Sequence, residues 1–203
     1  MKSKVYKSCE YKKIVEDLLN NEVVGFPTDT VYGLAIVYDS KEAFDKLYEI
    51  KNRSITKPIS MMVYSKDILE NVAYIDENSK KVIENLMPGA LTIILKAKED
   101  LPMHVTFNNK TIGVRIPTNE VALNILKEVN KPLLVTSANF SNEPSLIYSS
   151  DVKETFDGLI YSMIDEDALG NKASSVVSVY DGIKMLREGG IDINTITYVL
   201  GEE

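Results

Sequence analysis

The sequence has little of the residues that build metal and disulfide sites. Among its 203 residues it holds one cysteine, Cys9, and one histidine, His104. A single cysteine excludes an internal disulfide and a cysteine-rich zinc site, and a single histidine excludes a multi-histidine metal site. His104 lies near Pro102 in a segment that we predict to be a loop. We interpret it as a solvated side chain rather than a catalytic one.

Long apolar runs and an excess of positive charge are also missing. No apolar run approaches the roughly 18–20 residues that a membrane-spanning helix needs, and the amino-terminal residues lead into no signal-peptide core. The net charge is −7. This charge argues against broad nucleic-acid binding, which needs a basic surface to displace counterions. We therefore expect a soluble, cytoplasmic protein without a membrane partner, whose functional cations are few.

The residues that are present indicate one α/β domain over 1–203. An apolar content of 44% in a chain of this length allows one substantial core. Helical and strand patterns alternate, which predicts a single mixed, twisted β-sheet with flanking helices. We expect helices at 11–20, from an Asp39–Glu42 capping box, at 79–86 and after a Thr118 cap, and strands at 23–26, 34–38, 59–64, 91–95, 111–116, 133–136, 159–163, 175–179 and 183–186.

Residues 27–34 form the most informative segment. Two threonines, an aspartate and a tyrosine lie between two apolar runs. One interpretation is a turn that joins two strands, with Asp29 as a turn residue, because Asp and Thr side chains bond to their own backbone. The other is a functional loop, because a turn needs fewer polar side chains than this.

Two arginines and one lysine in the middle of the sequence are candidates for binding an anion. Lys51 and Arg53 lie two residues apart, so in an extended segment they would project to the same side and converge on one anion. The alternative is a basic helix end that complements the macrodipole. Arg115 lies in an apolar strand, where it needs a carboxylate or phosphate partner. That partner is either a ligand or a structural salt bridge.

Hydroxyl groups gather at the ends of other predicted strands. Residues 135–139 leave a strand and run into a polar turn that ends at Ser145, and Ser174 and Ser175 lie at a strand start. Arg187 ends a further strand before Gly189. Such strand ends suit phosphate or carboxylate binding, although the sequence contains no P-loop.

Taken together, these segments resemble the YrdC-type threonylcarbamoyl-AMP synthases along almost the whole chain. The matching motifs are T-D-T-x-Y-G-L at 28–34, K-x-R at Lys51 and Arg53, K-P at Lys57 and Pro58, P-G-x-x-T at Pro88, Gly89 and Thr92, R-x-P at Arg115 and Pro117, S-A-N at 137–139, S-S-V at 174–176, and a closing Arg187 and Gly189.

The resemblance implies a short, single-domain YrdC-like fold with a basic concave cleft. It also implies a nucleotidyltransferase that joins ATP, L-threonine and bicarbonate into L-threonylcarbamoyladenylate and releases pyrophosphate. Mg²⁺ is expected to arrive with ATP, because no tight protein cage for a metal is evident. The expected partners are the proteins that transfer the threonylcarbamoyl group to tRNA, while direct binding of tRNA is expected to be weak at most.

The resemblance also implies residue roles. Lys51 and Arg53 would be catalytic and would hold the triphosphate. The nucleotide site would be completed by Thr111, Ser137, Asn139, Ser145 and Arg187. Threonine would be held by Thr28, Arg115, Ser174 and Ser175, with the Arg115 guanidinium binding its carboxylate.

One departure keeps two alternatives open. Many family members carry a histidine after the lysine–arginine segment, where this chain has Met62. The chain is therefore a synthase, or a paralogue with the same cleft and a different acceptor, or a non-catalytic RNA-binding module. The acidic net charge makes the RNA-binding module the weakest of the three.

Overall fold

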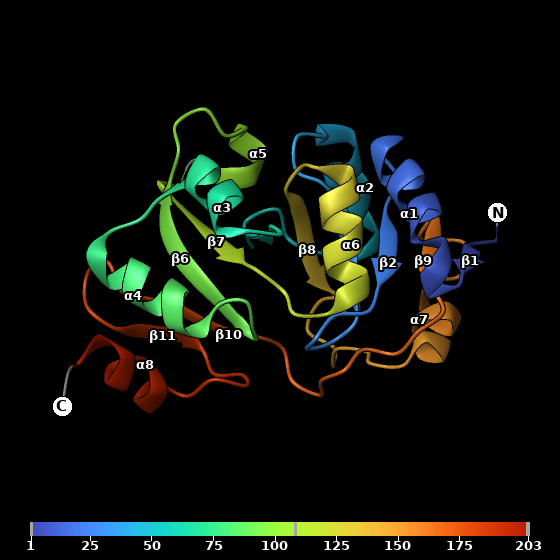
Figure 1. Cartoon of the computed structure of the whole chain (residues 1–203). Coiled ribbons are helices and arrows are strands. Elements are labelled where there is room, and N and C mark those ends of the chain that lie inside the picture. Colours follow the sequence, from blue (N-terminus) through green and yellow to red (C-terminus); the bar gives the residue numbers. More distant parts are fainter. Residues whose placement is uncertain (1, 108, 202–203) are drawn as a thin grey trace.

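One mixed β-sheet runs through the whole computed structural model, which describes residues 2–107 and 109–201 (Figure 1). In these residues the strand order is β1-β9-β2-β3-β8-β4-β7-β6-β10-β11, with β5 paired to β6. The strands are β1 Lys4–Tyr6, β2 Val24–Phe26, β3 Gly33–Val37, β4 Ser60–Met62, β5 Ala73–Tyr74, β6 Leu91–Ala97, β7 Thr111–Arg115, β8 Leu133–Ser137, β9 Ser162–Ile164, β10 Ser175–Ser178 and β11 Lys184–Arg187. Parallel and antiparallel pairs both occur, so the prediction of a mixed α/β sheet is confirmed.

Helices flank this sheet. They are α1 Tyr11–Leu19, α2 Lys41–Ile50, α3 Lys66–Val72, α4 Glu77–Leu86, α5 Met103–Thr106, α6 Glu120–Val129, α7 Ser149–Phe156 and α8 Ile193–Leu200, and a 3₁₀ turn at Ser8–Glu10 precedes α1. Within residues 2–107 and 109–201, every helix is too short or too polar to span a bilayer.

The half of the sheet that contains β2, β3 and β8 is covered on both faces over most of its length. Successive residues of β3 point to opposite sides, as strand geometry requires. Ala35 and Val37 pack with the apolar residues of α1 and α6, which lie side by side in front of the sheet in Figure 1. Leu34 and Ile36 join the second core cluster, which also contains residues of α2.

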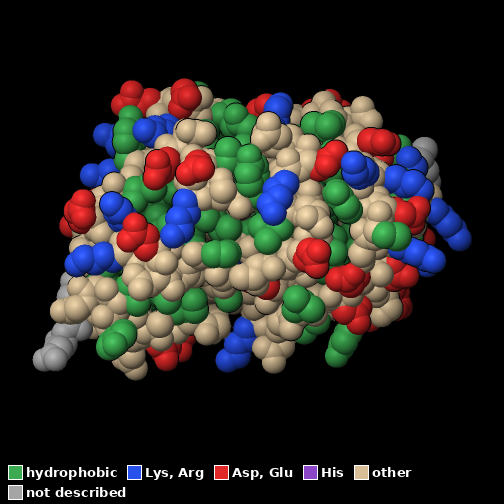
Figure 2. All heavy atoms as spheres, in the orientation of Figure 1, with side chains coloured by type: hydrophobic (Ala, Val, Ile, Leu, Met, Phe, Trp, Pro, Cys, Tyr) green, Lys and Arg blue, Asp and Glu red, His purple; other side chains and the backbone are tan. Residues whose placement is uncertain are grey.

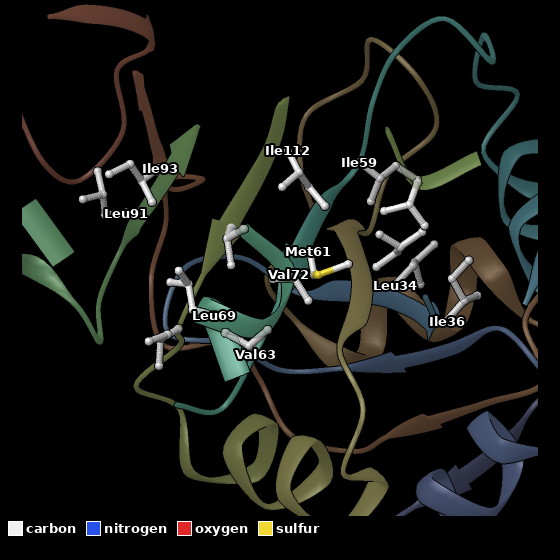
Figure 3. Close-up of a cluster of buried hydrophobic side chains, with 14 of the residues drawn as sticks. Leu34, Ile36, Ile59, Met61, Val63, Leu69, Val72, Leu91, Ile93 and Ile112 are labelled. Atoms are coloured by element: carbon white, nitrogen blue, oxygen red, sulfur yellow. The ribbon is translucent and has the colours of Figure 1, made fainter. Parts of the chain in front are cut away.

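The half that contains β6, β7 and β10 has one face in the core. Leu91, Ile93 and Ile112 point into a cluster that runs on to Leu34 and Ile36 (Figure 3). Helices α3, α4 and α8 contribute to the same cluster. The alternate residues of these strands, such as Thr92 and Ile94, belong to neither core cluster and face a cavity instead. This uncovered face is where the candidate site lies.

The described chain crosses three times between these two halves of the sheet, because groups of consecutive elements lie alternately in one half and in the other. The passages are residues 51–59, 116–119 and 165–174. The junction itself is the pairing of β8 with β4.

Several predicted details are wrong. Helix α2 is capped by Ser40, whose Oγ accepts from Ala43 N at 3.1 Å, rather than by Asp39. Asp39 pairs instead with Lys131 across 2.8 Å. Helix α6 is capped by Asn119, whose Oδ1 accepts from Ala122 N at 2.9 Å, rather than by Thr118. In both cases the cap lies one residue later than predicted.

His104 does not lie in a loop. It belongs to the short helix α5, and its Nε2 lies 2.9 Å from the carbonyl oxygen of Tyr38. Its ring packs edge-on against Phe44, with 5.1 Å between the ring centroids. The half-buried imidazole is therefore a packing residue, and our interpretation of a solvated side chain is wrong.

Candidate functional site

A cavity of about 290 Å³ lies on the uncovered face of the sheet. This volume is at the lower end of the range of small-molecule sites, which is roughly 300–1,000 Å³. Its floor contains Gly33, Val135, Met62, Gly113 and Ile94, which come from β3, β8, β4, β7 and β6. The site is therefore built across both halves of the sheet.

Three arginines bring positive charge to this cavity. Arg53 lies on the first passage between the halves, Arg115 ends β7 and Arg187 ends β11. None of the described residues that line the cavity is acidic. The pKa of Arg187 is lowered by burial and then by the charges of Arg115 and Arg53. The guanidinium groups of Arg115 and Arg53 thus both repel that of Arg187, and an anion would relieve this repulsion.

Arg115 is the most buried of the three arginines, with 5% of its surface exposed. Its Nη1 donates to Thr30 Oγ1 at 2.8 Å and its Nε donates to the carbonyl of Gly89 at 3.1 Å. Its Nη2 lies 2.8 Å from Asp29 Oδ2, without the alignment of a hydrogen bond. Burial lowers the pKa of Arg115, and Asp29 opposes that shift. Arg115 therefore has a structural salt bridge, as one of its two interpretations predicted, and it also lines the cavity, so the binding of a ligand stays a prediction.

Our first interpretation took Asp29 as a turn residue, but this side chain also takes part in a buried ion pair. Its Oδ2 forms the pair with Arg115, and its buried Oδ1 has no hydrogen-bond partner. The loop around it is ordered by Thr28, whose Oγ1 donates to the carbonyl of Val31 at 2.6 Å and accepts from Thr30 N at 3.1 Å. Thr28 and Thr30 both line the cavity.

Part of the guanidinium of Arg53, and part of that of Arg187, donates hydrogen bonds to neighbouring residues. Arg53 donates from Nε to the carbonyl of Lys57 at 3.1 Å and from Nη2 to that of Pro58 at 2.8 Å. Arg187 donates to the carbonyl and the Oγ of Ser174, at 2.9 and 3.1 Å. These bonds hold both arginines at the cavity wall.

Lys51 does not converge with Arg53, in contrast to our prediction. The segment is not extended, because Lys51 has near-helical backbone angles and Asn52 has a left-handed φ of 48°. The Lys51 side chain is 1% exposed and is not among the residues that line the cavity. Burial, and to a lesser extent Arg53, lowers the pKa of Lys51 to about 7.

Other predicted residues are divided between the cavity and its surroundings. Ser137 and Ser174 line the cavity, whereas Thr111, Asn139, Ser145 and Ser175 are not among its lining residues. Ser175 points to the other side of β10, where its Oγ accepts from the backbone N–H groups of Gly189 and Ile191. Thr111 lies four residues before Arg115, about 13 Å along the strand.

The sequence interpretation missed some of the cavity wall. Thr92 lies 2.8 Å from Ser174, oxygen to oxygen, and both line the cavity. Ser60 and Gly113 also line it. The signal that could have found them is the alternation of strands, since Gly113 shares a face with Arg115, and Ser60 shares one with Met62.

Among the described residues, no group of three His, Cys, Asp or Glu side chains could hold a metal ion. A divalent cation in this cavity would therefore take its ligands from a bound anion and water.

Comparisons with known proteins identify a family and several relatives for this chain. A family model named Sua5_yciO_yrdC and described as "Telomere recombination" matches residues 16–189. A threonylcarbamoyl-AMP synthase of Bacillus subtilis is 36% identical over 188 residues, which are 91% of this chain and 54% of that protein. A relative from Methanocaldococcus jannaschii is 34% identical over 92% of this chain and 91% of its own length. The chain thus spans about half the length of the Bacillus relative and nearly all of the Methanocaldococcus one.

Solved structures share the fold. The crystal structure of Pyrococcus abyssi Sua5 complexed with L-threonine superposes with a TM-score of 0.92 at 28% identity, over 100% of this chain and 62% of that one. Escherichia coli YciO superposes with a TM-score of 0.88 at 23% identity, over 96% of this chain and 99% of that one. With the match of the family model over most of its length, the chain belongs to the Sua5/YciO/YrdC family.

Proposed function

We propose that this chain is a threonylcarbamoyl-AMP synthase, which joins L-threonine, bicarbonate and ATP into L-threonylcarbamoyladenylate and pyrophosphate. The observation that carries the proposal is the convergence of Arg53, Arg115 and Arg187 on one cavity with hydroxyl groups beside them. The identity to the Bacillus synthase over 91% of the chain supports it. So does the likeness to a Sua5 structure that binds L-threonine.

The reaction asks the protein to align anions. The amine of threonine attacks the carbon of bicarbonate, water leaves, and a carbamate forms. A carbamate oxygen then attacks the α-phosphorus of ATP, and pyrophosphate departs. Catalysis of such a transfer consists largely of positioning the reactants and stabilising the charge on the transferred and leaving groups. Cations in a cavity without acidic lining residues suit both tasks.

The arginines have separate proposed roles. Arg53 and Arg187 would bind the triphosphate, because both line the cavity and only part of each guanidinium is bonded to its own surroundings. Arg115 would bind the carboxylate of threonine. Its buried pair with Asp29 fixes the orientation of the guanidinium, and a guanidinium can bind a carboxylate through two parallel hydrogen bonds.

The remaining predicted residues differ in whether they line the cavity, and therefore in whether they could contact a ligand directly. Ser137 would contact the nucleotide, and Thr28 and Ser174 would contact threonine, since all three line the cavity. Lys51, Thr111, Asn139, Ser145 and Ser175 lie outside the lining, so any role they have in binding would be indirect or would need a movement of the chain.

The product defines the proposed partners. An activated threonylcarbamoyl group must be passed on by proteins that transfer it to tRNA, and tRNA modification is the process that we propose for this chain. The face shown in Figure 2 carries acidic and basic side chains interspersed, with no continuous basic patch. On this face, the pattern argues against direct binding of RNA.

A second candidate is a paralogue that activates a different acceptor. Met62 lines the cavity where many family members carry a histidine. Replacing a polar ring by an apolar thioether changes which small zwitterion the floor accepts.

The decisive experiment measures pyrophosphate release by the purified protein with MgATP. The synthase should release pyrophosphate only when threonine and bicarbonate are both present. Release that does not depend on threonine would favour the paralogue. Calorimetric titration with threonine and a non-hydrolysable ATP analogue would show directly whether both substrates bind, and Arg187→Ala is the control that should weaken the nucleotide titration.

A further inference from the structure

The ammonium group of Lys51 is enclosed by oxygen atoms of one turn. Its Nζ donates to the carbonyl of Ser137, to the carbonyl of Asn139 at 2.6 Å and to Asn139 Oδ1 at 3.1 Å. A lysine ammonium has three N–H donors. These three contacts therefore engage every donor of Lys51.

The three acceptors belong to residues 137–143, which we call the β8 turn because it follows β8. Within it, Ser137 Oγ donates to Asn139 Oδ1 at 2.6 Å and Asn139 Nδ2 donates to the carbonyl of Glu143 at 2.6 Å. Ser141 N also donates to the carbonyl of Lys51 at 3.0 Å. Both the side chain and the backbone of Lys51 thus tie the β8 turn to the end of α2.

The β8 turn begins at the cavity, whereas Lys51 lies behind it. Ser137 lines the cavity, and Lys51 is not among the lining residues. Arg53, two residues further on, does line it. The left-handed Asn52 separates the two cations, so that one points into the protein and the other into the cavity.

We infer that Lys51 is a positioning residue, which holds the β8 turn so that Ser137 stays in the cavity wall and which does not touch the ligand. The inference rests on the proposed function only in taking the cavity as the ligand site. Removing the ammonium would remove the donor that the three oxygen acceptors share and would leave Asn139 Oδ1 with Ser137 Oγ alone, so the β8 turn would open more often.

The first test needs no ligand. Lys51→Met removes the ammonium and keeps an unbranched side chain. Lys46→Met is the matched control, because it removes a lysine of the same helix that pairs with Glu42 and Glu22. Amide hydrogen exchange at residues 137–146, measured at about pH 6 where Lys51 is protonated, should become about tenfold faster or more in Lys51→Met and stay unchanged in Lys46→Met. Exchange as slow as in the wild type would overturn the inference, because a lysine that only binds phosphate leaves the free protein unaltered.

The second test asks whether Lys51 acts through Ser137. The affinity for a non-hydrolysable MgATP analogue is measured by calorimetry in Lys51→Met, Ser137→Ala and the double variant. A positioning role predicts that the double variant binds about as weakly as the weaker single variant, since Ser137 is already displaced. Losses that multiply would mean that Lys51 contacts the ligand itself, and would overturn the inference.

A third variant covers the case in which Lys51→Met does not fold. Asn139→Ala keeps the lysine and removes one of its acceptors, and it should also speed exchange at residues 137–146. No change in that exchange would again overturn the inference. Because exchange is measured without substrate, these results stand apart from the pyrophosphate assay, so failure of the proposed function and failure of this inference are distinguishable.

Discussion

Asp29 and Arg115 form a buried ion pair in which Nη2 and Oδ2 lie 2.8 Å apart and the side chains are 9% and 6% exposed. The pair joins the loop between β2 and β3 to the end of β7. Removing one partner of a buried pair leaves the other charge uncompensated, at a cost of about 3–5 kcal/mol. We therefore expect Asp29→Ala to lower the free energy of unfolding in urea by roughly 3 kcal/mol.

The double variant tests that explanation. If the cost arises from an unpaired Arg115, then Asp29→Ala combined with Arg115→Ala should be less destabilising than the sum of the two single variants. Strict additivity would mean that Asp29 stabilises the loop independently of Arg115.

Arg115→Ala should also affect the KM values of the two substrates to different extents. Because we place threonine at Arg115 and the triphosphate at Arg53 and Arg187, the variant should raise the KM for threonine more than the KM for ATP. Steady-state rates of pyrophosphate release provide both constants. Equal effects on both, or a lower melting temperature with unchanged constants, would leave Arg115 with the salt bridge alone.

Arg53→Ala should lower the rate without lowering stability. Loss of one charge-stabilising donor typically costs a factor of roughly a hundred or more in rate. The free energy of unfolding should change little, because relief of the repulsion between Arg53 and Arg187 offsets the loss of the two hydrogen bonds that Arg53 donates to backbone carbonyls. Turnover and thermal unfolding of the same sample check both statements, with Lys41→Ala, which removes a surface cation paired with Asp45, as the control. A wild-type rate would remove Arg53 from the mechanism.

Gly113→Ala should weaken ligand binding by reshaping the cavity floor. A Cβ at this position would lie 3.1 Å from Thr92 Cγ2 and 3.2 Å from Ile94 Cδ1, so both side chains must shift. We expect a higher Kd for MgATP or threonine in calorimetry. Gly190→Ala is the matched control, since its Cβ would make an ordinary contact of 3.4 Å with Ala90. Unchanged affinities for both substrates would show that the floor at Gly113 is not used.

The pH dependence of stability tests the burial of Lys51. Its pKa falls from an ordinary 10.5 to about 7 in the folded protein, mainly through burial. Between these values the unfolded chain binds a proton that the folded chain does not, so raising the pH stabilises the fold at this site. The unfolding free energy of the wild type minus that of Lys51→Met should be constant below pH 7 and rise above it, by up to about 1.4 kcal/mol per pH unit.

Lys46→Met again provides the control for this pH series. The pKa of Lys46 is raised by Glu42 rather than lowered, so its difference curve should be flat over the same pH window. A flat curve for Lys51→Met as well would mean that its three oxygen acceptors offset the effect of burial.

The sheet could be predicted from the sequence because periodicity reports which residues are buried. The short apolar runs of β3 and β6 reflect strands that are largely buried, and the helical spacing in α1 and α6 reflects one apolar face. The caps were harder, because Asp39 and Ser40, or Thr118 and Asn119, are equally suitable cap residues. Only the path of the chain decides which of the two candidate side chains lies next to the first N–H groups of the helix.

The candidate site was predictable as a set of motifs but not as a geometry. Sequence alone indicated that Arg115 needs a partner, yet Asp29 lies 86 positions earlier and no local pattern joins them. The opposite orientations of Lys51 and Arg53 depend on the left-handed angle of Asn52, which a spacing rule for extended chains cannot foresee. Ser175 was paired with Ser174 by sequence adjacency, whereas the strand separates them onto opposite faces.

The passages between the halves of the sheet have a thermodynamic consequence. Arg53 lies on the first passage and Ser174 ends the third, and both line the cavity. An anion bound by both Arg53 and Arg187 would link the first passage to β11, which lie far apart in the sequence. Such a link exists only in the folded chain, so the melting temperature should rise with the concentration of the anion.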